Sequence, residues 1–169
     1  MNRRMIPAVL VAGLVAAAGP VAAANAAPPS SANGVPPIEV SGGATLTNFC
    51  KFPVTYTVTG KAKAITKPNG ERIFTSPGQR ITLSANGKTV NYVITGSRFE
   101  RDVVVGGVTT TEVEVKGRNI LINEIGKTMI SGIFLVVGNF NFEFVDGVES
   151  RSFNPKGPGQ VTDVCEALS

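Results

Sequence analysis

Two glutamates in the middle of the chain have the type and spacing for acid–base chemistry. Glu112 and Glu114 stand in the run Thr-Thr-Thr-Glu-Val-Glu-Val, and residues two apart in a β-strand project from the same face. Two carboxylates about 5 to 9 Å apart can act as acid and base on a glycosidic bond. Val113 and Val115 alternate with the glutamates, however, and this pattern favours a strand with valines inward and carboxylates on a solvated outer face.

A second carboxylate pair, Glu100 and Asp102, has the same spacing. These pairs matter because the chain contains no histidine, which excludes Ser-His-Asp and Cys-His catalysis and removes a common zinc ligand. The sequence also lacks an Asp-x-Asp-x-Asp calcium pattern and a Gly-x-x-x-x-Gly-Lys-Ser/Thr phosphate loop. We therefore expect no catalytic residue, no metal site and no cofactor, with carboxylate chemistry as the remaining enzymatic possibility.

The amino terminus is typical of a secretory signal peptide. A basic start at Arg3 and Arg4 precedes an apolar stretch from Met5 to Ala18, and Ala24-Asn25-Ala26 offers small residues for cleavage. Residues 1–26 are therefore predicted to be removed, and the mature protein is predicted to be secreted and extracellular. Its longest apolar run is too short to span a bilayer, so no membrane span is expected after the leader.

The charge of the mature chain argues against nucleic acid as a partner. Loss of Arg3 and Arg4 leaves 14 basic residues against 12 acidic ones. They form no basic stripe of the kind that neutralises phosphates. The surface charges Lys61, Lys63, Arg98 and Arg101 are interpreted as edge or surface charges that deter sheet-to-sheet association, and we assign them no site.

Cys50 and Cys165 are the only cysteines. An even pair in an exported protein predicts a disulfide, which here would close a loop of roughly 115 residues and stabilise the fold by on the order of 4 to 5 kcal/mol. The alternative is a redox-active pair, but that chemistry favours close spacing such as Cys-x-x-Cys. The predicted bridge would hold the two ends of the folded part together.

Residues 44–169 are predicted to form a single all-β domain after a flexible lead-in at 27–43. Apolar and polar residues alternate with a period of two, most clearly at Phe140, Phe142 and Phe144. Pairs typical of two-residue hairpin turns separate the strands. They are Asn69-Gly70, Asn86-Gly87, Gly106-Gly107, Gly138-Asn139 and Asp146-Gly147. The expected architecture is an antiparallel meander of about 8 to 10 strands, forming a β-sandwich or flattened barrel.

Three local patterns add detail to this domain. Residues 130–137 are apolar on both faces, which predicts a central strand or a cavity wall. Asp163 and Glu166 have the spacing of a helix N-cap with a reciprocal partner, so a short helical turn is expected at the C-terminus. The ladder of Phe140, Phe142 and Phe144 favours core packing, although in a closed barrel the same ladder would line a site for an apolar ligand.

Several segments resemble small exported β-proteins of actinobacteria. The resemblance is carried by Asn48-Phe49-Cys50-Lys51-Phe52-Pro53, Ser76-Pro77-Gly78, Gly117-Arg118-Asn119-Ile120-Leu121 and residues 161–168, Val-Thr-Asp-Val-Cys-Glu-Ala-Leu. These proteins have no assigned function, so the resemblance implies an extracellular location and paired cysteines but no activity and no site.

The sequence favours a secreted, non-enzymatic β-domain that binds an extracellular ligand or protein. The ligand classes left open are a partner protein, a surface glycan and a small apolar molecule. The alternatives are a histidine-free, carboxylate-dependent hydrolase or lyase, and a structural envelope component. An enzyme would need carboxylates converging in a cleft, whereas a binding domain would need an exposed patch or a cavity.

Overall fold

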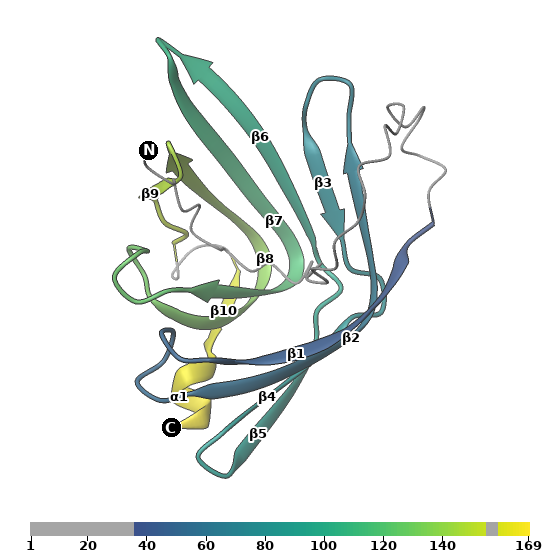
Figure 1. Ribbon diagram of the computed structural model, residues 1–169, viewed down its shortest axis with the longest axis vertical. Helices are drawn as coiled ribbons and strands as arrows, with labels where there is room; N and C mark the ends of the chain where they lie inside the picture. The colour runs from purple at the N-terminus through teal and green to yellow at the C-terminus, as the bar shows by residue number, and fades with distance from the viewer. Residues whose placement is uncertain (1–35, 155–158) are drawn as a thin grey trace, which may run out of the picture.

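The computed structural model describes residues 36–154 and 159–169, which form one ten-stranded antiparallel sheet followed by a short helix (Figure 1). The all-β prediction is therefore confirmed. The proposed signal peptide, 1–26, and the first part of the proposed lead-in, 27–35, lie outside the described residues. The elements are β1 (Ile38–Leu46), β2 (Val54–Thr66), β3 (Arg72–Thr75), β4 (Arg80–Ala85), β5 (Lys88–Val93), β6 (Ser97–Val105), β7 (Val108–Asn123), β8 (Gly132–Val145), β9 (Val148–Arg151), β10 (Gln160–Asp163) and α1 (Val164–Leu168).

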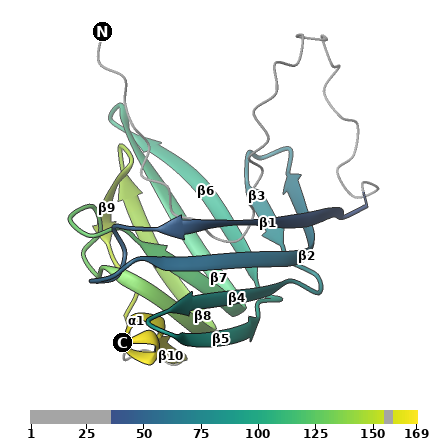
Figure 2. The same cartoon turned by 60° about the horizontal axis from the view of Figure 1, so that its bottom comes forward.

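The sheet is a meander whose strands are interrupted at corners. The first part of β2 pairs with β4 and its last part pairs with β3, so β3 and β4 lie one after the other along the same edge of β2. At their opposite edges, β4 pairs with β5 and β3 pairs with β6. In Figure 2, β1, β2, β4 and β5 lie side by side as one layer, with β7 and β8 crossing behind them. The chain thus makes two layers from one continuous sheet.

The first strand begins earlier than the sequence pattern indicates. β1 starts at Ile38 and pairs with β2 from Ile38 opposite Ala62 to Leu46 opposite Val54. The expected start at Ala44, and hence a flexible lead-in reaching residue 43, is wrong. The segment has few apolar residues, but backbone pairing with β2 and burial of Val40 supply the stabilisation that its composition lacks.

The β7–β8 hairpin is the longest continuous strand pair of the second layer, because every residue of β8 has a partner on β7. Gly117 and Gly138 lie directly opposite each other with φ of 78° and 135°, respectively. The expected hairpin turn at Gly138-Asn139 is therefore wrong, since both residues are inside β8. Glycine is required at 138 for another reason: a Cβ there would lie 2.9 Å from the Cα of Gly159.

Three of the other predicted turns are two-residue hairpin turns, whereas at Asn69-Gly70 only Gly70 has positive φ and residues 67–71 connect β2 to β3. Asn86 and Gly87 both have positive φ between β4 and β5, as do Gly106 and Gly107 between β6 and β7. Asp146 and Gly147 do the same between β8 and β9. Mirror-image turns of this kind match the right-handed twist of the strands that they join.

Hydrophobic cores cover both faces of β8. Ile133 and Leu135 pack into a first core with β1, β2, β4, β7 and α1, whereas Phe134 and Val136 belong to a second core on the opposite face. The prediction of a central strand with two apolar faces at residues 130–137 is confirmed. This strand fixes the relation between the two layers because its side chains are shared by both cores.

The phenylalanine ladder fills the second core. Phe140, Phe142 and Phe144 are 3%, 4% and 7% exposed. The rings of Phe142 and Phe144 meet edge to face with centroids 5.9 Å apart, and Phe153 contacts Phe140 in the same way at 6.0 Å. Val113 and Val115 pack beside the ladder, as their alternation with glutamates predicts. Core packing is therefore the role of these aromatic residues.

A disulfide between Cys50 and Cys165 joins the loop after β1 to α1, with their Cα atoms 5.5 Å apart. The predicted helix cap is also present, because the Asp163 side chain accepts a hydrogen bond from the Glu166 amide at 3.0 Å. Val164 and Leu168 of this short helix are fully buried in the first core. The bridge and the cap together hold the C-terminus against the sheet.

Candidate functional site

An open hollow of about 430 Å³ lies over β6, β7, β8 and β9. We call it the outer hollow because most of the strand residues that line it, such as Phe99, Glu112 and Asn141, are on the face opposite the phenylalanine ladder. The residues that line it are Glu71, Phe99, Glu100, Arg101, Glu112, Val113, Glu114, Asn141, Glu143 and Arg151. Carboxylates, guanidinium groups, an amide and one aromatic ring therefore meet at one surface of the protein.

Strand register explains why these residues meet. Glu114 lies opposite Phe99 on β6 and opposite Asn141 on β8. Directly opposed residues in an antiparallel sheet have Cβ atoms about 4.5–5.5 Å apart, so the aromatic ring, the carboxylate and the amide form a row across three strands. We call this row, made of Phe99, Glu114 and Asn141, the aromatic row.

The neighbouring row consists of charged residues. Glu112 lies opposite Arg101 on β6 and Glu143 on β8, and Glu143 is paired with Arg151 on β9. The guanidinium of Arg101 contacts Glu112 at 2.5 Å, and that of Arg151 contacts Glu143 at 2.5 Å. Hydrogen bonds to these carboxylates raise the pKa of both arginines. This charged row is solvent-accessible and its two ion pairs are complete.

Lys116 lies next to the aromatic row and contacts two of its members, Phe99 and Glu114. Its Nζ lies 4.9 Å from the centroid of the Phe99 ring and 3.0 Å from Glu114 Oε2. A cation over a ring face is attracted by the ring quadrupole, and the nearby carboxylate adds a direct charge interaction. One ammonium group is therefore held between an aromatic ring and a carboxylate at the edge of the hollow.

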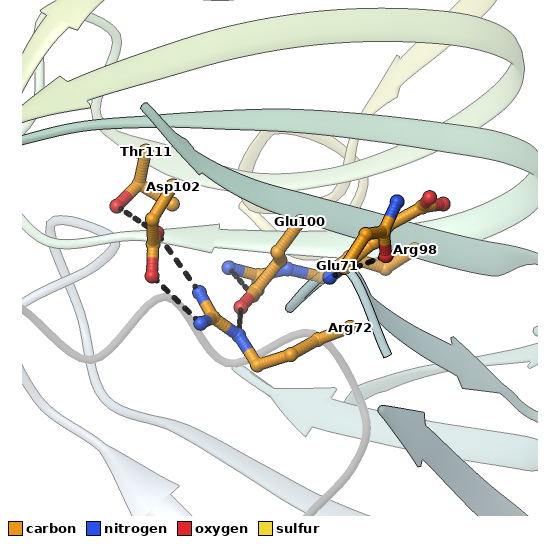
Figure 3. Close-up of polar contacts among 7 residues, drawn as sticks. Glu71, Arg72, Arg98, Glu100, Asp102 and Thr111 are labelled. Atoms are coloured by element: carbon orange, nitrogen blue, oxygen red, sulfur yellow. Dashed lines mark hydrogen bonds and ion pairs between the residues drawn. The ribbon is translucent and has the colours of Figure 1, made fainter. Parts of the chain in front are cut away.

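The second carboxylate pair lies on the opposite face of the sheet, in the network of Figure 3. Arg72 donates from Nε to Glu100 at 2.8 Å and from Nη1 to Asp102 at 2.8 Å. Thr111 donates to Asp102 at 2.8 Å, and Arg98 forms an ion pair with Glu100. The hydrogen bond from Arg72 is the main cause that lowers the pKa of Asp102. Both carboxylates are thus fixed by arginines.

The structure places the two candidate carboxylate pairs on opposite faces of the sheet. Glu112 and Glu114 share a face, and their side chains are 42% and 37% exposed, as an outer face requires. Glu100 and Asp102 share the other face, where Arg72 binds both, and of the two only Glu100 also borders the hollow. Glu143 completes the outer hollow and was missed, although its position between Phe142 and Phe144 already indicated that it faces away from the ladder.

The interpretation of Arg98 as a surface charge is wrong. Its side chain is only 11% exposed, and burial lowers the pKa of its guanidinium. Arg98 shares its face with Glu100 and Asp102, and the register places that face beside Val113 and Val115 rather than in solvent. Arg101 does lie at the surface with a 63% exposed side chain, and Lys61 is an exposed partner of Glu39.

Metal binding and membrane insertion are two further properties that bear on function. Within residues 36–154 and 159–169, cysteine, aspartate and glutamate side chains form no group of three that is suited to hold a metal ion. In the same residues, α1 is far too short to cross a bilayer, and no other helix has the length or apolar character to do so.

Fold and site together define an all-β protein with a disulfide and an open, mixed-charge hollow on one sheet face. In comparisons with known proteins, no family model, no curated protein and no solved structure matches the chain.

Proposed function

We propose that this protein is a secreted, non-enzymatic β-domain that binds a surface glycan in the outer hollow. The observation that carries the proposal is the aromatic row. Phe99, Glu114 and Asn141 line an open hollow side by side. Secretion is proposed from the pattern of residues 1–26, and the Cys50–Cys165 disulfide is compatible with an oxidising, extracellular compartment.

The chemistry of this row suits a sugar. Each sugar hydroxyl both donates and accepts hydrogen bonds, and Asn141 offers both an amide donor and a carbonyl acceptor. Glu114 offers acceptor oxygens, which form the stronger, charge-assisted hydrogen bonds. The apolar C–H face of a pyranose ring packs against an aromatic surface, which Phe99 supplies. The hollow is open, as a site for an extended polymer must be.

The packing of the phenylalanine ladder supports a polar ligand over a small apolar one. Phe142 contacts Phe144, Phe140 contacts Phe153, and all of them belong to one buried cluster with Val113 and Val115 of β7. An apolar carrier needs an enclosed, mostly apolar pocket, whereas the outer hollow is lined mainly by charged and amide groups. A partner protein remains an alternative occupant of the same surface.

One observation favours the rival class, a histidine-free hydrolase or lyase. Glu112 and Glu143 lie directly opposite each other in the hollow, and a pair of neighbouring carboxylates is the arrangement that glycoside hydrolysis uses. Each of them is engaged by an arginine, which is an arrangement typical of structural ion pairs. Binding is therefore the better-supported proposal. A structural envelope component is the remaining alternative, and it would bind no soluble glycan.

Glycan binding is tested by isothermal titration of the purified mature protein against a panel of cell-wall and extracellular oligosaccharides. Phe99→Ala and Asn141→Ala should each weaken binding, on the order of tenfold for the loss of a buried ring contact or hydrogen bond. Asn91→Ala is the matched control, because Asn91 is exposed on β5 in the other layer. Equal affinity in all three variants would contradict the proposed site, and release of reducing sugar during the titration would favour the hydrolase.

A further inference from the structure

We infer that the outer hollow recognises the protonated amino group of an amino-sugar glycan, and that Lys116 occupies this amine seat in the free protein. The inference rests on the proposed function and deepens it, since it specifies which class of glycan the aromatic row selects. The amine seat is defined by the ring of Phe99 and the carboxylate of Glu114.

The geometry of the seat carries the inference. The Lys116 ammonium lies 4.9 Å from the centroid of the Phe99 ring and 3.0 Å from Glu114 Oε2. An aromatic face together with a carboxylate is the combination that attracts alkylammonium groups most directly, because the ring quadrupole and the full negative charge act together. The position of the Lys116 ammonium therefore indicates that Phe99 and Glu114 together favour a primary ammonium group.

The charge of the hollow agrees with a cationic ligand. Of the glutamates that line the hollow, Glu71 is paired with Lys67 at 3.0 Å, and Glu100 is paired with Arg72 at 2.8 Å. Arg101 and Arg151 neutralise Glu112 and Glu143 within the hollow. Glu114 instead depends on Lys116, so a departing lysine side chain leaves an uncompensated carboxylate beside the ring. A ligand ammonium restores that charge balance.

Lys116 is suited to be displaced. Its side chain is 44% exposed, and it holds Glu114 through a single ion pair, a type of contact that contributes little at a protein surface. Long lysine side chains move freely in water, so exchange for a ligand ammonium costs little free energy. An oligomer with several amino groups gains further from additional contacts along the hollow. The resident lysine thus weakens binding without preventing it.

The experiment compares glucosamine oligomers with N-acetylglucosamine oligomers of equal length by isothermal titration at mildly acidic pH, where the amines are protonated and the carboxylates remain charged. The wild-type protein should bind the amine form and not the acetylated form. Lys116→Ala should tighten binding roughly two- to fivefold, because the internal competitor is gone. Glu114→Gln should weaken it on the order of tenfold, because the charged hydrogen-bond acceptor is lost.

Matched controls come from the exposed Lys61–Glu39 ion pair on the other layer. Lys61→Ala and Glu39→Gln change charge in the same way, but they lie on β2 and β1, neither of which pairs with the strands of the aromatic row. Neither should alter affinity by more than about the measurement error. Circular dichroism of each variant verifies that the β-fold is retained, and none of the four side chains is buried.

The outcomes separate the two proposals. Equal binding of both oligomers, unaffected by Lys116→Ala, overturns the amine seat while glycan binding stands. Binding of the polyamine spermine with the same dependence on Lys116 and Glu114, but of neither oligomer, overturns the glycan and supports the seat. Tighter binding of glucosamine oligomers to Lys116→Ala supports both. Failure of all three probes to bind overturns both.

Discussion

Glu112 and Glu143 face each other across β7 and β8, and an arginine flanks each of them on the side away from the other. The charges along this line therefore run positive, negative, negative, positive. Opposed like charges in a sheet are destabilising, and Arg101 and Arg151 offset that repulsion from the two neighbouring strands. The short strand β9 contributes one of these arginines, so its position and the glutamate pair are linked.

Substitution of Arg151 should leave the repulsion between Glu112 and Glu143 uncompensated on one side. Arg151→Ala is expected to lower the unfolding temperature slightly, because Glu143 loses its partner beside Glu112. In the Glu143→Gln background the same substitution should have almost no effect, since the like-charge pair no longer exists. Thermal unfolding followed by circular dichroism measures the four variants of this cycle. An equal loss in both backgrounds would show that Arg151 acts independently of the glutamates.

The disulfide should supply a large part of the stability. It closes a loop with a sequence separation of 115, for which the chain-entropy relation gives about 4 to 5 kcal/mol as an upper value. The double variant Cys50→Ala, Cys165→Ala should therefore unfold at a much lower denaturant concentration. Mass spectrometry of the mature protein without reductant should find it two hydrogens lighter than the reduced chain. Two free thiols in the purified protein would contradict the bridge.

The second core predicts a high cost for truncating its central ring. Phe142 is 4% exposed and packs edge to face on Phe144, so Phe142→Ala should reduce the free energy of unfolding by about 3 to 5 kcal/mol. Val148→Ala is the control, since Val148 is 67% exposed and its loss should be nearly neutral. A mild effect of Phe142→Ala, together with a lipid that co-purifies at one equivalent, would point instead to an apolar cavity.

The network around Arg72 predicts a dependence of stability on pH. Hydrogen bonding to Arg72 lowers the pKa of Asp102 in the folded state. The stabilisation is therefore complete above the pKa of an unfolded aspartate, about 3.9, and is lost as pH falls through the lower pKa of the folded protein. Asp102→Asn should lower the unfolding temperature at neutral pH.

The difference between wild type and Asp102→Asn should then shrink below about pH 4. Thermal scans at intervals between neutral and strongly acidic pH give the two curves. Thr111→Val provides a comparison, because it removes one hydrogen bond to Asp102 and leaves the carboxylate and Arg72 in place. A temperature difference for Asp102→Asn that does not change with pH would mean that the ionised carboxylate contributes nothing.

The local features of this protein follow from its amino-acid sequence. Alternation with a period of two identified the strands, and Phe140, Phe142 and Phe144 were correctly assigned to a buried face. The two apolar faces of residues 130–137 indicated a central strand, and Asp163 with Glu166 indicated the helix cap. These features depend on residues that are close together in the sequence, and they could therefore be predicted from it.

The tertiary structure alone decided which of these faces meet. Gly138 has the backbone freedom of a turn residue, but its partner Gly117 and the close approach of Gly159 place it inside a strand. Ile38 to Gly43 form a strand because β2 lies beside them, a fact that their own composition does not contain. Pairing between distant strands therefore overrode local preference at both positions.

The candidate site shows the same division. Spacing placed Glu112 and Glu114 on one face, yet only the register of β7 with β6 and β8 brings Phe99, Asn141 and Glu143 to them. The register also sets Glu100 and Asp102 on the opposite face, where arginines hold them. A strand's two faces follow from its own sequence, but the residues beside it follow from pairing with strands elsewhere in the chain, and that pairing exists only in the folded sheet.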